Sequence, residues 1–227
     1  MSTSTRTPEA ESLDIVVVGA FNPAIFHPDW FLRQKLIGEE DAKEAKIKLV
    51  SNEVSEVQLC GLRLVCISER LSIGTSNISQ AARMQDLLAN IFTLLSHIPV
   101  TACGINPSVH YAVSSVEYWH KIGHTLAPKE LIWDQLLAQP GMQSLTIKAR
   151  RAGEYPGDTY VTVEPSAKFF PGVFVRSNYH FPLPQTEVHT GAAAVLLKFL
   201  EAEWEPACAM ARHVAEKIFE KIKADHD

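Results

Sequence analysis

The chain has 227 residues, of which 46% are hydrophobic and 21% are charged. These fractions are typical of a compact fold and exclude a mainly disordered chain. The 21 lysines and arginines are outnumbered by 26 aspartates and glutamates, so the net charge is -5 and a general attraction to nucleic-acid phosphates is disfavoured.

The four cysteines are scattered and lack the paired spacing of a zinc site. No apolar run approaches the roughly 18 residues that a membrane-spanning helix needs, and the polar start of the chain does not resemble a secretion signal. We therefore expect reduced cysteines, a cytoplasmic location and no membrane partner. Residues 1–12 are predicted to form a disordered tail.

The first half of the chain, residues 13–99, is predicted to open with a buried strand over residues 13–18. Gly19 and Asn22-Pro23 stop that strand in a turn. The elements expected next are a short helix at 28–37, a charged surface segment at 39–48, strands at 47–52, 57–68 and 70–75, and a helix that ends at Pro99. The strand at 57–68 is predicted to be central in its sheet, because both of its faces are apolar.

The second half, residues 100–227, is predicted to repeat this order of elements. Its first strand, at 100–113, is expected to be interrupted by Gly104 and Asn106-Pro107. The elements expected next are a helix from a Ser114 cap to Gly123, a helix at 129–137, strands at 142–151, 160–164 and 173–180, a type II turn at Pro156-Gly157, and a helix at 188–223. Pro206 removes a hydrogen bond inside the last helix, so a break is expected there.

A short motif is shared by the two halves. In each, a glycine is followed by Asn-Pro and then by a tryptophan at the start of a short helix, Trp30 in the first half and Trp119 in the second. At a proline usage of about 5%, fewer than one Asn-Pro is expected by chance in a chain of this length. The matched order favours an internal duplication, and coincidence is the alternative.

Short links between consecutive strands favour antiparallel pairing, and helices that follow runs of strands pack on the sheet. The predicted fold class is therefore α+β, with two pseudo-repeats of strand, excursion, three antiparallel strands and a long helix. The helices are expected on one face of a mainly antiparallel sheet, and the repeats are expected to form one compact unit. The seam between them is a place where a ligand or a partner could bind.

No catalytic or nucleotide-binding motif of the common types occurs in the sequence, such as Gly-x-Ser-x-Gly or His-Glu-x-x-His. His120 and His124 have the spacing of two metal ligands on one helix face, with His110 and Glu117 before them in the sequence. Gly123 is expected to end the helix before His124, so we interpret these histidines as helix-end residues. We therefore expect no metal and no cofactor, and we favour a protein without catalytic activity.

The favoured function is a binding or assembly protein that contacts a protein partner or a second copy of itself. The candidate surface is the aromatic run that contains Phe169, Phe170 and Phe174. An alternative is a small-ligand binder or an enzyme with its site in the seam between the repeats, for a ligand that the sequence does not identify. The seam candidates are Arg63, His110, His120 and Arg176.

A second alternative is nucleic-acid binding by a basic face of the second sheet. Lys148 and Arg150 alternate with apolar residues along one predicted strand, and aromatic residues lie on the neighbouring strands. The basic-face candidates are Lys148, Arg150, Arg151 and Lys168. The negative net charge disfavours this function, and a solvated outer face is the simpler interpretation of the pattern.

Overall fold

The computed structural model describes residues 6–183 and 191–223. Within them the chain forms an α+β fold on one antiparallel sheet of nine strands, which confirms the predicted class at that level. Across the sheet the strands follow the order β2-β3-β4-β5-β1-β6-β9-β8-β7. Strands of both halves therefore share one sheet, and a separate second sheet is not found in the described part of the chain.

The strands are β1 (Ala10–Gly19), β2 (Lys46–Val50), β3 (Val54–Leu59), β4 (Leu62–Ile67), β5 (Arg70–Thr75), β6 (Val100–Ala112), β7 (Leu145–Arg151), β8 (Gly157–Pro165) and β9 (Gly172–Pro182). The α-helices are α1 (Pro28–Arg33), α2 (Glu39–Glu44), α3 (Ala81–Leu94), α4 (Val116–Leu126) and α5 (Ala192–Lys221). No described helix is long and apolar enough to cross a membrane.

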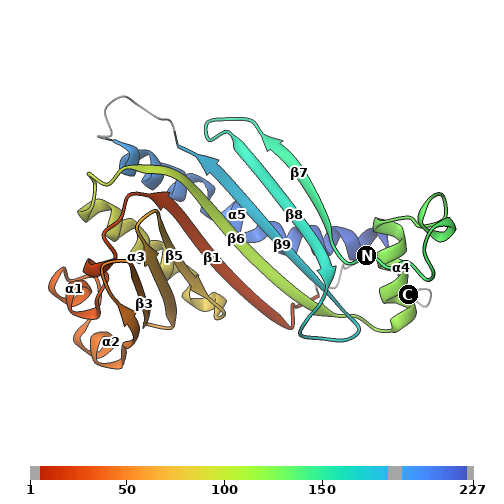
Figure 1. Ribbon diagram of the computed structural model, residues 1–227, viewed down its shortest axis with the longest axis horizontal. Coiled ribbons are helices and arrows are strands. Elements are labelled where there is room, and N and C mark those ends of the chain that lie inside the picture. The colour runs from red at the N-terminus through yellow and green to blue at the C-terminus, as the bar shows by residue number, and fades with distance from the viewer. Residues whose placement is uncertain (1–5, 184–190, 224–227) are drawn as a thin grey trace.

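The two faces of the sheet differ because side chains alternate along each strand. On β1, Leu13, Ile15 and Val17 are buried in one hydrophobic cluster with residues of α3 and α5, whereas Asp14 and Val18 are exposed on the opposite face. Figure 1 shows α5 running along the length of the sheet on its covered side. The opposite side is the open face, and around the middle of β1, β6 and β9 it carries polar side chains such as Asp14, Asn106 and Arg176.

The predicted central strand at 57–68 is wrong, because the chain turns in its middle. Cys60 and Gly61 have φ angles of 53° and 76°, and Leu59 pairs with Leu62 across this two-residue turn. Two positive φ angles suit the tight turns that join antiparallel strands. The sequence pattern did not reveal this turn, because the residues on both sides of it are apolar. β3 and β4 are each buried on one face only.

The break in the strand predicted at Gly104 and Asn106-Pro107 is also wrong, because β6 is one continuous strand of thirteen residues. Its pairing with β9 does have a gap, at Asn106 and Pro107. Asn22-Pro23 does begin a turn, where the Asn22 side chain accepts a hydrogen bond from the Ala24 N–H at 3.2 Å. Asn106-Pro107 instead lies opposite Asp14 and Leu13 in the middle of the sheet. The two Asn-Pro pairs are therefore not equivalent in structure.

Three predictions around the second excursion need correction. The α4 helix has Ser115 as its N-cap and continues through Gly123 to Leu126, because one glycine costs a helix only about 1 kcal/mol. The helix predicted at 129–137 is reduced to a single 3-10 turn at Trp133–Gln135. The predicted type II turn is absent, since Gly157 begins β8 and the positive φ of 116° belongs to Gly153.

The long helix α5 contains Pro206 without being divided there, so the predicted break is wrong. Trp204 and Ala207 on either side are buried in the core. We attribute the continuity to this packing, which outweighs the cost of about 3 kcal/mol for an interior proline. The predicted start of the helix, at 188–190, lies outside the described residues, as do residues 1–5 of the predicted tail; β1 already begins at Ala10.

Candidate functional site

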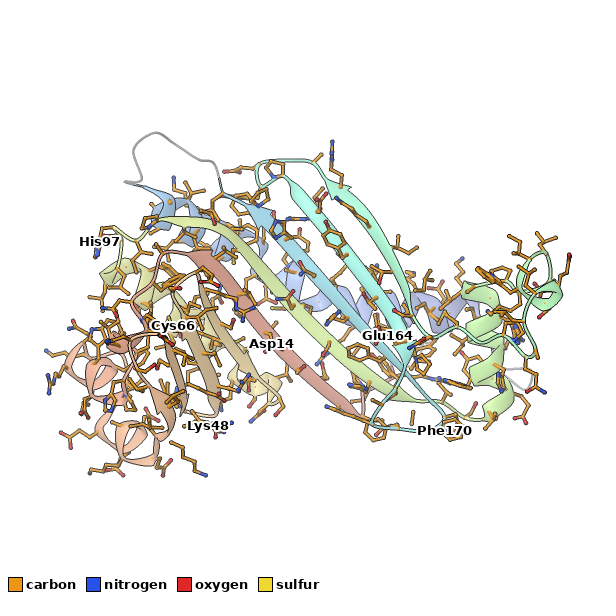
Figure 2. All side chains as sticks on the ribbon, viewed as in Figure 1. Asp14, Lys48, Cys66, His97, Glu164 and Phe170 are labelled. Atoms are coloured by element: carbon orange, nitrogen blue, oxygen red, sulfur yellow. The ribbon has the colours of Figure 1, made fainter. Side chains whose placement is uncertain are left out.

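The first candidate site is a polar groove on the open face, with a volume of about 520 Å³. It crosses from β1 over β6 and β9 to β8 and β7, and so lies over the junction of the two halves of the chain. We call it the open-face groove, and it is lined by Asp14, Asn106, Ser108, Thr146, Tyr160, Thr162, Arg176 and Asn178. Figure 2 shows Asp14 midway along β1.

Two opposite charges face this groove. Asp14 makes no hydrogen bond or ion pair with any residue that the structure describes, and the same is true of Arg176. Loss of solvent around its carboxylate raises the pKa of Asp14, and the positive charges of Arg63 and Arg176 oppose that shift. The groove therefore presents a carboxylate and a guanidinium that are both available for a ligand.

The polar floor of the groove is only partly hydrogen-bonded. The hydroxyls of Ser12 and Ser108 lie 2.7 Å apart, and those of Thr146 and Thr162 lie 3.0 Å apart. The Oδ1 atom of Asn178 is buried without a hydrogen-bond donor among the described residues. A buried acceptor without a donor is costly.

The second candidate site is an exposed apolar segment between α4 and β7, which we call the apolar protrusion (residues 131–137). Its large apolar side chains and their exposed fractions are Leu131 84%, Ile132 57%, Trp133 47%, Leu136 69% and Leu137 54%. Soluble proteins rarely leave so many neighbouring apolar side chains in water. The segment is therefore a candidate contact surface.

A hollow of about 410 Å³ lies beside the protrusion, and we call it the α4 hollow. Its apolar lining residues are Trp119, Ile122, Pro140, Met142, Val163, Pro165 and Val173. The segment is held to α4 by buried Lys129, whose Nζ donates to the carbonyl oxygen of Gly123 at 3.0 Å and to that of Ala127. This cation lies at the carbonyl end of α4, where the helix dipole favours positive charge.

The four seam candidates do not come together. Only Arg176 lines the open-face groove, while Arg63 on β4 pairs with Glu56 at 3.0 Å. His110 is buried on β6, where its Nδ1 lies 2.8 Å from the Ser166 hydroxyl and its ring lies 4.6 Å from that of Phe174. His120 lines the α4 hollow.

The basic-face candidates are also dispersed. Lys148 pairs with Asp158 at 2.9 Å across β7 and β8, next to exposed Arg150. The Arg151 guanidinium donates to the His180 carbonyl at 2.6 Å and lies 3.5 Å from the ring centre of Tyr179, whose hydroxyl bonds Glu203 of α5.

Lys168 lies in the loop between β8 and β9, and Arg151 lies on the covered side of the sheet. A continuous basic stripe is therefore not formed by these four residues.

Of the aromatic candidates, Phe170 is the most exposed, at 75%. It lies at the β8–β9 loop in Figure 2, with its ring 5.6 Å from that of Trp119, which lines the α4 hollow. Phe169 and Phe174 are half-buried and contact His110. The aromatic run thus contributes one exposed ring to the surface that contains the protrusion and the hollow.

The described residues hold no group of three or more His, Cys, Asp and Glu side chains suited to a metal ion. His120 and His124 do share one face of α4, with ring centres 6.3 Å apart, but no third ligand joins them in that part of the chain. Burial raises the pKa of Cys60 to about 11 and those of Cys66 and Cys208 to about 12. These thiols are therefore protonated near neutral pH and are poor nucleophiles.

Sequence reasoning missed most of the groove and the protrusion. Asp14, Asn106 and Asn178 are polar residues that alternate with buried ones on their strands, a pattern that also describes any solvated face. Leu131 and Leu136 fall in the helix predicted at 129–137, a prediction that says nothing about their exposure. Ile132, Trp133, Leu136 and Leu137 follow one another at intervals of one and three residues, which also suits a helix, so the sequence held no signal that they are exposed.

The fold and these surfaces define an α+β protein with one open sheet face and one exposed apolar protrusion. No family model matches the chain, and no curated protein matches it.

Proposed function

We propose that the chain is a non-catalytic binding protein that associates with a second copy of itself through the apolar protrusion. The observation that carries this proposal is the exposure of five large apolar side chains within residues 131–137, led by Leu131 at 84%. Contiguous apolar surface of this kind marks interaction sites.

A second copy is favoured as the partner because the chain carries both halves of a complementary contact. The apolar protrusion projects beside the α4 hollow, which Trp119 and Met142 line and which exposed Phe170 borders. In a two-fold dimer the same patch of each subunit faces its copy, so each protrusion can enter the hollow of the other. Two such contacts would cover both apolar surfaces together.

The test is the native mass, measured by sedimentation equilibrium over a range of protein concentrations. We expect a species of about twice the 25.2 kDa of one chain. The double variant Leu131→Glu and Leu136→Glu should be monomeric, because each dimer would bury unpaired carboxylates. A matched control is Ile47→Glu on β2, which is 50% exposed and distant in the sheet. A wild-type monomer at every concentration, or a dimer that survives the double variant, would contradict the proposal.

The internal duplication stays a proposal about the origin of this fold. In its favour, β3-β4-β5-β1 and β7-β8-β9-β6 occupy mirrored positions about the β1–β6 junction. Each half also ends in a helix on the covered face, and Gln85 of α3 donates to the Leu200 carbonyl of α5 at 3.2 Å. The Asn-Pro match no longer supports it. Nucleic-acid binding stays a prediction without a specific observation in its favour.

A further inference from the structure

We propose that the open-face groove binds a small zwitterion, such as a free amino acid, with Arg176 holding its anionic group and Asp14 its cationic group. This site goes beyond self-association, since the groove and the α4 hollow share no lining residue.

The groove lies where the pairing of two central strands is interrupted. The register of β6 and β9 passes from Ile105 opposite Tyr179 to Ser108 opposite Arg176, with no paired residues between them. Pro107 lies in this gap and has no N–H to donate to a neighbouring strand. Polar side chains of the gap, including Asn106 and Asn178, are among those that line the groove.

The arrangement of charge selects a ligand that carries both signs. Asp14 on β1 and Arg176 on β9 are separated across the sheet by β6, and along the strand direction they are offset by two residues. At ordinary strand spacing their Cα atoms are therefore about 12 Å apart. No ion pair joins them within the described residues, and the other nearby cation, Arg63, is paired with Glu56. A simple anion would be repelled by the carboxylate of Asp14, and a simple cation would be repelled by the guanidinium of Arg176. A zwitterion can pair with both.

The groove also accommodates such a ligand sterically. A Cβ atom on Gly74 of β5 would collide with the carboxylate of Asp14, so this glycine makes room for that carboxylate beside the groove. An ammonium group has three N–H donors, which suit the carboxylate oxygens of Asp14. A volume of about 520 Å³ is in the range of small-molecule sites.

Isothermal titration of the full chain with each of the common L-amino acids in turn tests the proposal. We expect at least one to bind, and acetate, inorganic phosphate and methylammonium to bind at least about tenfold more weakly, which corresponds to about 1.4 kcal/mol. Arg176→Gln and Asp14→Asn should each weaken binding about tenfold or more. Arg150→Gln is the matched control, because Arg150 is an exposed arginine of the same sheet that does not line the groove.

Three results would overturn the proposal. They are an absence of binding by every amino acid at about 10 mM, binding of phosphate as tight as that of any amino acid, and amino-acid binding that survives both groove variants. Both variants should keep the wild-type circular dichroism spectrum and native mass. A failure of self-association would leave the titration unchanged, so the two proposals fail independently.

Discussion

The chain leaves the central strand pair twice, after β1 and after β6, and the two excursions place their apolar side chains differently. In the first, Phe26 and Phe31 are fully buried and their rings lie 6.2 Å apart. In the second, Leu131 and Leu136 are mostly exposed. The first excursion therefore stabilises the fold of its own chain, whereas the protrusion of the second contributes little to that fold and is available to another molecule.

The largest effect expected from this comparison is on stability. Phe26→Ala should lower the free energy of unfolding by about 3–5 kcal/mol, because it leaves a cavity among buried aromatic rings. Leu131→Ala should change it by less than about 0.5 kcal/mol, because the side chain is already in water. Urea unfolding at a protein concentration that keeps the chain monomeric measures both. Equal losses from the two variants would refute the contrast between the excursions.

A smaller effect is expected at the anchor of the second excursion. Lys129→Met should lower the free energy of unfolding by about 1.5–3 kcal/mol, because carbonyl oxygens at the end of α4 lose a charged donor. Lys46→Met, at an exposed lysine of β2, is the control and should have no measurable effect. Urea unfolding again gives the values. If Lys129→Met matches its control, the anchor contributes nothing to the stability of the fold.

The smallest effect concerns pH. Burial, and next the charge of Lys168, lower the pKa of His110, so the unfolded chain binds a proton at a higher pH than the folded chain does. The contribution of neutral His110 to the free energy of unfolding should therefore be fully present above the ordinary histidine pKa of about 6.5. It should be lost as pH decreases through the lower pKa of the folded chain. His110→Gln should reduce this fall, measured as the difference in melting temperature between pH 7 and pH 5. His97→Gln, at an exposed histidine, should not. An identical pH profile in His110→Gln would show that this histidine does not titrate differently on folding.

Local chemistry made several elements predictable. The apolar run of β1, the close link between β4 and β5 and the apolar spacing of α3 all depend on neighbours in sequence, and all three elements are present. Long-range packing decided others. Pro206 and Gly123 stay inside helices because buried neighbours hold α5 and α4 in place, a contribution that helix propensity does not include.

By itself, the sequence determined the α+β class, most of the strands and the absence of common catalytic motifs, because these depend on residue type and short-range period. Only the tertiary structure decided that one nine-stranded sheet brings Asp14 of β1 into the same groove as Arg176 of β9. It also decided which excursion buries its apolar residues. The physical reason is that burial and charge proximity depend on the order of strands across the sheet, which differs from their order along the chain.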